Sequence, residues 1–333
     1  MKNYEQIKNY AKKCISGEII SCKKHKWACE RFLRDAEKFE TDPEYPYYWN
    51  EEAAQSIVDW FALLRHSKGI LAGKPILLTE WQRFRICQLY GWRKKKERDA
   101  QIQKKHLRKL PEKNAKSQEE AGIALYEISV TATKNREVCE VYTAGVKRDQ
   151  SKIVFNEADL MLRGSPLRKK FDVTKVMITH TKTGSFIKPL SKEDGKSGDG
   201  TNPAALIVDE YHQHPTTEFY DLGLGANTKE PLLMIITTAG VDLTYPCYTM
   251  EYTYCSRILD PFSDVEDEEY LVDICEMDAE DYGDLERLGN EELWHKANPI
   301  RMTYEDGQDK IRGEYKIAKE IPEHMTAFLY KIV

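Results

Sequence analysis

The sequence lacks a membrane-spanning segment, a signal peptide and the cysteine and histidine spacing of common zinc sites. Its longest apolar runs, such as residues 232–236, fall far short of the roughly 20 residues that a helix needs to cross a bilayer. Residues 1–10 are too polar for a signal peptide. The eight cysteines include no CxxC pair and no His/Cys ladder with zinc spacing. We therefore expect a cytosolic protein without a membrane partner, whose thiols are reduced and structural.

A uniformly basic character is absent as well. The net charge is −5, which argues against a protein that coats nucleic acid with a uniformly basic surface. The charges are unevenly distributed, with a basic run at residues 93–113 and an acidic segment at residues 260–292. The basic run either contacts phosphate backbone or forms a solvated loop. We interpret the acidic segment as solvated rather than as a nuclease metal site, because no alternating strands accompany it.

Length and periodicity predict a helical N-terminal region followed by an α/β region. A chain of 333 residues with 41% hydrophobic content suggests about two domains and a sizeable core. Apolar residues at helical spacing predict helices before residue 68, and Thr79 is a candidate N-cap for another helix over residues 78–90. From about residue 104 to 240, strands alternate with helices. This alternation predicts a mainly parallel sheet flanked by helices.

Two carboxylates follow the most apolar of the predicted strands. Residues 204–208 form a short run suited to a strand buried on both faces, and Asp209 and Glu210 come directly after it. Ligands bind at the carboxyl ends of strands in open α/β sheets. Such a pair is typical of a Walker B box, in which the first acid holds Mg²⁺ and the second orients the attacking water. The alternative is that both acids cap the next helix.

Residues 110–117, LPEKNAKS, contain part of a phosphate-binding loop. Lys116 and Ser117 supply the residues that would reach the β/γ-phosphates and Mg²⁺, and good helix formers follow them. The two glycines of such a loop are missing, with Leu110 and Ala115 in their places. The preceding residues 104–109 are too charged for an ordinary buried strand. On these residues alone, a P-loop is rejected.

The order of the motifs changes this interpretation. KNAKS (113–117), LIVDE (206–210) and IITTAG (235–240) resemble the Walker A, Walker B and coupling motifs of P-loop motor ATPases. The chain is similar, over nearly its whole length, to the large terminase subunit of tailed bacteriophages, as shown by LTEWQ (78–82), AGVKRDQSKIVFNEA (144–158), DGTNPAALIVDEYHQH (199–214) and ANP (297–299).

The resemblance implies a P-loop NTPase fold of the ASCE type, with Lys116 and Asp209 facing one crevice from the ends of neighbouring strands. It also implies three parts. These are a helical N-terminal region (1–69), an ATPase core (70–258), and an acidic lid or linker segment (259–333) leading to a nuclease domain that we do not expect this sequence to encode.

The resemblance also implies roles for individual residues. ATP would be bound by Trp81, Gln82, Lys113, Asn114, Ala115, Lys116 and Ser117, and Mg²⁺ by Ser117 and Asp209. Glu210 would position water, Thr237 and Thr238 would couple hydrolysis to movement, and Lys147 or Arg148 would reach phosphates across a subunit boundary. From its residue type alone, Gln82 either reads an adenine edge or is a solvated helix glutamine.

The function implied by the resemblance is an ATPase that packages double-stranded DNA into a procapsid. Its partners would be the small terminase subunit and the portal, and it would act as a homo-oligomeric ring in the host cytoplasm. Two departures from the family pattern keep an alternative open. Glu112 replaces a basic residue, and Ala115 would cost on the order of 1 kcal/mol if its position needs φ > 0. The alternatives are a nucleotide-binding remnant with weak turnover and another P-loop ATPase such as a helicase-like protein.

Overall fold

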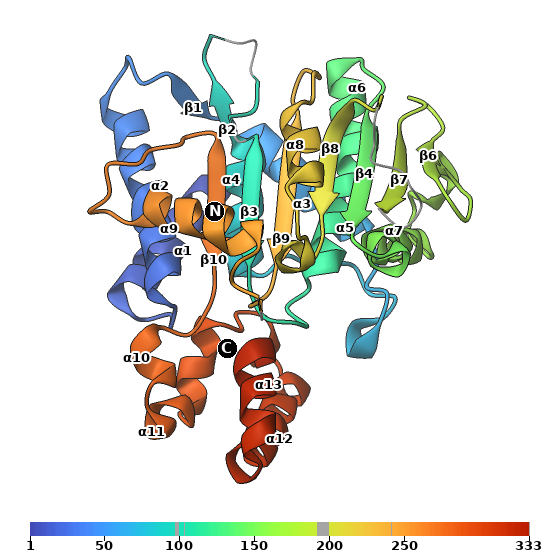
Figure 1. The fold of residues 1–333 in the computed structure, drawn as a ribbon. Helices are drawn as coiled ribbons and strands as arrows, with labels where there is room; N and C mark the ends of the chain where they lie inside the picture. The colour runs from blue at the N-terminus through green and yellow to red at the C-terminus, as the bar shows by residue number, and fades with distance from the viewer. Residues whose placement is uncertain (97–99, 103, 192–199, 241, 333) are drawn as a thin grey trace.

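The computed structural model of the chain (Figure 1) describes residues 1–96, 100–102, 104–191, 200–240 and 242–332. The helices are α1 (Asn3–Ser16), α2 (Lys23–Thr41), α3 (Glu51–Leu63), α4 (Glu80–Gly91), α5 (Lys116–Tyr126), α6 (Ala132–Asn135), α7 (Arg148–Leu162), α8 (Glu218–Leu224), α9 (Thr253–Leu259), α10 (Ala279–Tyr282), α11 (Leu285–Leu288), α12 (Glu305–Glu320) and α13 (Pro322–Ile332). The strands are β1 (Tyr47–Trp49), β2 (Trp92–Lys94), β3 (Lys105–Lys109), β4 (Glu140–Gly145), β5 (Phe171–Val173), β6 (Ile178–His180), β7 (Phe186–Ser191), β8 (Pro203–Val208), β9 (Leu232–Thr237) and β10 (Tyr270–Ile274).

The main sheet confirms the predicted fold class. Among the described residues, eight strands pair in the order β10-β3-β9-β8-β4-β7-β6-β5. The strands from β10 to β7 are parallel, whereas β6 and β5 join the edge in antiparallel pairs. All parallel strands therefore end at the same edge of the sheet. The strand β9 lies between β3 and β8, so the expectation that the two motif-bearing strands are neighbours is wrong.

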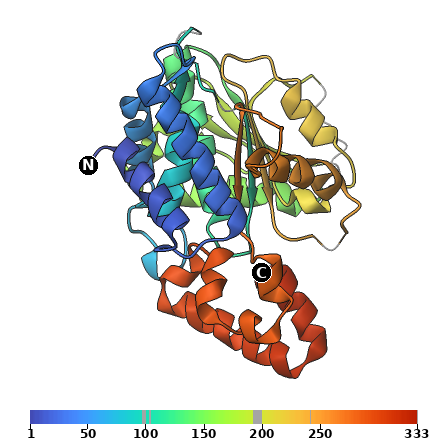
Figure 2. The same cartoon turned by 90° about the vertical axis from the view of Figure 1, so that its left-hand side faces the viewer.

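Helices cover both faces of the sheet, because the side chains of its central strands alternate between two cores. In β8, Ala205 and Ile207 pack in the core beneath α3, α4, α5 and α7. Leu206 and Val208 pack in the core that includes residues of α8 and α9. Figure 2 shows the blue N-terminal helices and the yellow and orange helices on opposite sides of the sheet. The central strands are therefore buried on both faces, as a continuous apolar run predicts.

The charged residues 104–109 nevertheless form a strand inside this sheet, between β10 and β9. Arg108 is fully buried, and its Nη1 lies 3.3 Å from Glu119 on α5. The ammonium of Lys109 lies 2.7 Å from Glu276. The prediction that this segment is too charged for a buried strand is wrong, because opposite charges from other elements offset the cost of burying these cations.

The basic run and the acidic segment neutralise each other, and neither is simply solvated. The acidic segment contains β10, which lies beside β3 with Tyr270 opposite Lys105 and Ile274 opposite Lys109. The ion pairs that join the two segments are Lys94–Glu269, Lys104–Glu269, Lys105–Asp267 and Lys109–Glu276. The interpretation of the acidic segment as solvated is therefore wrong for Asp267 and Glu276, and the solvated-loop alternative for the basic run is wrong for Lys105 and Lys109, whereas Lys104 and Glu269 pair at the surface. Arg98 of the basic run lies outside the described residues.

The two ends of the chain form helical parts on different sides of the sheet. The predicted N-terminal helices are present as α1, α2 and α3, with Gly17 in the left-handed conformation after α1 and Asn50 capping α3. Helices α10 to α13 form a separate C-terminal unit with its own apolar core around Trp294 and Phe328 (Figures 1 and 2). No helix in the described part of the chain combines the length and apolarity needed to span a membrane.

Candidate active site

The loop between β3 and α5 has the backbone of an anion-binding turn. Lys113 and Ala115 both have positive φ, of 65° and 57°. Left-handed residues in such a turn allow successive N–H groups to converge on one side, which makes a nest for phosphate. Ala115 is also the N-cap of α5, whose N-terminus carries a partial positive charge. The position therefore requires φ > 0, as a glycine would provide, and alanine there costs about 1 kcal/mol.

Lys116 is the first residue of α5 and its side chain is buried. Its ammonium donates to the carbonyl oxygens of Leu110 at 2.9 Å and Pro111 at 3.3 Å. Burial lowers the pKa of Lys116 to about 8, and the carboxylates of Glu210 and Asp209 partly offset this shift. The two acids are therefore close enough to act on the charge of the lysine, although β9 separates their strands. Ser117 follows in the first turn of α5 and is partly buried.

Asp209 and Glu210 stand at the end of β8. Asp209 is buried, and its Oδ1 accepts a hydrogen bond of 2.9 Å from the backbone N–H of Glu210. Burial and the neighbouring charge of Glu210 raise the pKa of Asp209 to about 7, and burial also raises the pKa of Glu210. Glu210 has φ of 49°, and its side chain makes no capping bond to the short helix that follows. The alternative of two helix-capping acids is therefore wrong for Glu210.

Hydroxyl groups at the end of β9 contact this acidic turn. Thr238 Oγ1 lies 3.4 Å from Glu210 Oε2. Thr237 Oγ1 accepts a hydrogen bond of 3.2 Å from the backbone N–H of His212. The same histidine lies 3.0 Å, through Nε2, from the hydroxyl of Tyr330 on α13. The acidic turn thus contacts the end of β9 through Glu210 and His212, and α13 through His212.

The phosphate loop is also joined to the C-terminal unit by Asn114. Its Nδ2 donates to Asn298 Oδ1 at 3.0 Å, and its Oδ1 accepts from the backbone N–H groups of Ile300 and Arg301 at 3.2 and 3.1 Å. Asn114 and Asn298 are both fully buried. The sequence shows both asparagines, in KNAKS and in ANP, but contains no signal that they touch. This link therefore escapes sequence reasoning.

The residues expected to contact adenine lie on α4, away from the acidic turn. Gln82 is buried and forms a capping box with Thr79, and its Nε2 lies 3.3 Å from Glu119. The alternative of a solvated glutamine is therefore wrong. The ring of Trp81 packs against the guanidinium of Arg85, 4.0 Å from its centroid. Trp81 also lines a cleft of about 300 Å³.

Lys147 and Arg148 lie beyond the end of β4, at the beginning of α7, and both are exposed. Within this chain, the structure brings together the phosphate loop, Lys116, Asp209, Glu210 and the two threonines. Gln82 instead bonds to Thr79 and Glu119, and Arg148 is exposed at the first position of α7.

A mainly parallel sheet with helices on both faces, in which β9 is inserted between β3 and β8, gives the chain the fold of a P-loop NTPase. The family model for the terminase large subunit, ATPase domain, matches residues 80–257. The chain belongs to this family.

The chain is also similar to solved structures and to a bacterial protein. The crystal structure of the HK97 bacteriophage large terminase superposes with a TM-score of 0.64 at 20% identity, covering 84% of this chain and 54% of that one. The Thermus phage P74-26 large terminase ATPase domain gives a TM-score of 0.45 at 13% identity, covering 71% of this chain and 91% of that one. Protein YmfN of Escherichia coli (strain K12) is 42% identical over 62 residues, which are 18% of this chain and 13% of that protein. The chain thus spans about half the length of the HK97 protein and a small part of YmfN.

Proposed function

We propose that this chain hydrolyses ATP to drive the packaging of double-stranded DNA into a procapsid. The observation that carries the proposal is the convergence of Lys116, Asp209 and Glu210 at one edge of the sheet, beside a loop with left-handed backbone. Membership of the terminase ATPase family supports packaging as the process that consumes the ATP. The small terminase subunit and the portal would be partners, and a homo-oligomeric ring in the host cytoplasm would be the active form.

The residues of the loop have the chemistry needed to bind a nucleoside triphosphate. We assign the phosphates to Lys113 through Ser117, where the N-terminus of α5 and the left-handed turn favour negative charge. Lys116 would exchange its two carbonyl acceptors for phosphate oxygens. Ser117 and Asp209 supply the hydroxyl and carboxylate oxygens that Mg²⁺ prefers, and Mg²⁺ when bound would neutralise charge on the phosphates.

Glu210 is the candidate for orienting the attacking water. Burial raises the pKa of Glu210, and the charge of Lys116 partly offsets this shift; when deprotonated, its carboxylate could accept a proton from water. Thr238 contacts this carboxylate, so we assign Thr237 and Thr238 to coupling. Arg148 would act on phosphates bound by a neighbouring subunit. Trp81 and Gln82 would lie on the base side of the nucleotide, where Gln82 supports α4 through its capping box.

The organisation that supports this function has three parts. We assign residues 1–69 to a helical N-terminal region, 70–258 to the ATPase core, and 259–333 to a C-terminal segment. The last segment contributes β10 to the sheet before it forms the helical unit that contacts the phosphate loop.

A second candidate function is nucleotide binding with little turnover. Two features favour it. Ala115 occupies a left-handed position, and Glu112 places a carboxylate on the exposed side of the loop, where it contributes to raising the pKa of Glu210. Neither feature removes a group that the hydrolysis mechanism needs, so we place this function second.

The two candidates are separated by steady-state ATPase measurements with and without double-stranded DNA. We expect turnover in the parent, and Glu210→Gln should lower kcat by at least about 100-fold while ATP still binds, because the amide keeps the shape but loses the base. Glu37→Gln, at an exposed position of α2, is the matched control and should leave the rate unchanged. Equal rates in the parent and Glu210→Gln would refute the assigned role. ATP binding without turnover in the parent would favour the second function.

A further inference from the structure

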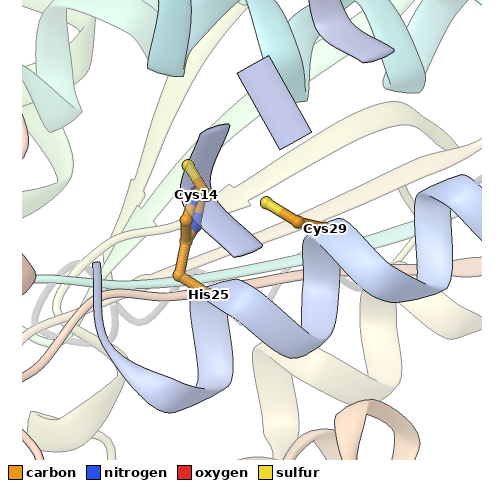
Figure 3. A group of neighbouring side chains, drawn as sticks. All are labelled: Cys14, His25 and Cys29. Atoms are coloured by element: carbon orange, nitrogen blue, oxygen red, sulfur yellow. The ribbon is translucent and has the colours of Figure 1, made fainter. Parts of the chain in front are cut away.

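Two cysteines and a histidine outside the phosphate loop converge in the N-terminal region. Cys14 comes from α1, and His25 and Cys29 come from α2 (Figure 3). Their exposed fractions are 0%, 1% and 0%. The two Sγ atoms and a ring nitrogen all lie within 4.8 Å of one another. Each of these side chains is thus shielded from water and directed at the same point.

The histidine is oriented as metal-bound histidines are. Its Nδ1 lies 2.8 Å from Oδ1 of the buried Asp273 on β10. A metal-ligating histidine commonly donates its second ring N–H to a carboxylate, which fixes the tautomer and the direction of the free nitrogen. Nε2 is then the nitrogen available to a metal. The hydroxyl of Tyr10 lies 3.0 Å from Nε2 and supplies an oxygen at the same place.

We propose that Cys14, His25 and Cys29 bind a structural zinc ion, with the Tyr10 hydroxyl at the fourth position and Asp273 as the outer carboxylate. Two thiolates and an imidazole are a donor set that Zn²⁺ favours, and two thiolates balance its charge. With Zn–S of about 2.3 Å and Zn–N of about 2.0 Å, tetrahedral ligands stand roughly 3.8 Å apart for two sulfurs and roughly 3.5 Å apart for sulfur and nitrogen. From separations of up to 4.8 Å, a contraction of at most about 1.3 Å therefore closes the site.

A second grouping shares the histidine but is less suited to a metal. Cys275 lies near His25 and Asp273, with its Sγ 4.0 Å from Nδ1 and 3.9 Å from Oδ1. In this group Nδ1 and the carboxylate already bond directly to each other. We therefore assign the metal to the Nε2 side and treat Cys275 as a neighbour of the site.

The site has an entry path and a structural purpose. Tyr10, His25 and Cys275 line the same cleft of about 300 Å³ as Trp81, so an ion can approach the buried thiols from that side. A metal would join α1 to α2 and, through Asp273, to β10. Asp273 Oδ2 also lies 3.0 Å from Nε of Arg85 on α4. Four elements would thus be held together beside the strand that leads into the phosphate loop.

The three proposed zinc ligands are not spaced as in the common CxxC motifs. His25 and Cys29 are four residues apart and therefore lie on one face of α2. Cys14 comes from the preceding helix, and only the packing of α1 against α2 brings its thiol to them. The i, i+4 pair is the one signal that sequence reasoning could have used.

The test uses the full chain, purified without a metal-binding tag, reduced, and stripped with a chelator. We expect it to take up one equivalent of Zn²⁺ by elemental analysis, and to melt at a higher temperature with zinc than without it. Co²⁺ in place of zinc should give the visible bands of a tetrahedral site and a thiolate charge-transfer band whose intensity corresponds to two sulfurs. Failure of the reduced wild-type chain to bind either ion would overturn the proposal without any variant.

Variants identify the ligands. Cys14→Ser and Cys29→Ser should each lose tight zinc binding, and Asp273→Asn should weaken it by about 10- to 100-fold. Cys275→Ala is the matched control, because it removes an adjacent buried thiol and should keep one equivalent of zinc. If a serine variant fails to fold, the sulfur count from Co²⁺ on the wild type still decides the question. Zinc lost in Cys275→Ala but kept in Cys14→Ser would refute the assignment.

Discussion

The buried Asn114 should hold the phosphate loop and the C-terminal helices together. Asn114→Ala would remove the acceptor of the backbone N–H groups of Ile300 and Arg301 and the donor to Asn298 Oδ1. Each buried polar group that loses its partner costs about 1–3 kcal/mol, and groups that hydrogen-bond to water instead reduce the total. We therefore expect the free energy of unfolding to fall by about 2–5 kcal/mol.

Hydrogen exchange and urea unfolding measure this effect. Amides in α12 and α13 should exchange faster in Asn114→Ala, because the unit loses its anchor to the loop. Asn114→Asp keeps the acceptor for both N–H groups but turns a carboxylate oxygen toward Pro111 O, Glu112 O and Asn298 Oδ1, so it should lose at least as much stability as alanine. Asn227→Ala, at an exposed site, should change stability by less than about 0.5 kcal/mol.

The prediction also has an internal check. Asn298→Ala combined with Asn114→Ala should cost less than the sum of the single changes, because the two side chains share one hydrogen bond. The reasoning is refuted if Asn114→Ala unfolds at the same urea concentration as the parent and α12 keeps its exchange protection.

Three further outcomes are expected. Ala115→Gly should relieve the backbone strain of an alanine at φ 57°, so the protein should bind ATP more tightly and its free energy of unfolding should rise by up to about 1 kcal/mol. Calorimetric titration measures the first effect and thermal unfolding the second. Unchanged values in both would contradict the strain. Burial raises the pKa of Glu127 to about 7, so the folded state binds the extra proton and this group should lower stability by about 3 kcal/mol as pH rises from about 4.5 through 7. In urea unfolding at pH 5 and pH 8, Glu127→Gln should reduce the slope by this amount without removing it, because Asp209 and Glu120 also have raised pKa values; an unchanged slope would contradict the role of Glu127. Lys147→Ala should weaken salt-dependent DNA binding more than Lys94→Ala does, because Lys147 is exposed whereas the Lys94 ammonium already pairs with Glu269. Fluorescence anisotropy measures both affinities, and a larger loss in Lys94→Ala would contradict the phosphate contact of Lys147.

The sequence determined the class of fold and the chemistry of its main site. Continuous apolar runs can be buried only between two layers of helices, and parallel strands end at one edge, so Asp209 and Lys116 had to face the same crevice whichever strand lay between them. The positive φ of Ala115 was equally foreseeable, because the position belongs to glycine in a phosphate loop.

Tertiary structure decided where the charges and polar groups of distant segments meet. Residues 104–109 look too charged to be buried until the residues on either side of β10 supply Asp267 and Glu276 from more than a hundred residues away. The contact of Asn114 with Asn298 likewise joins residues 184 positions apart. The approach of Cys14 to His25 depends on how α1 packs against the next helix, α2. Local patterns report the period of a helix or strand, whereas the partner of a buried polar group is set by packing, since only packing determines which side chains are removed from water together.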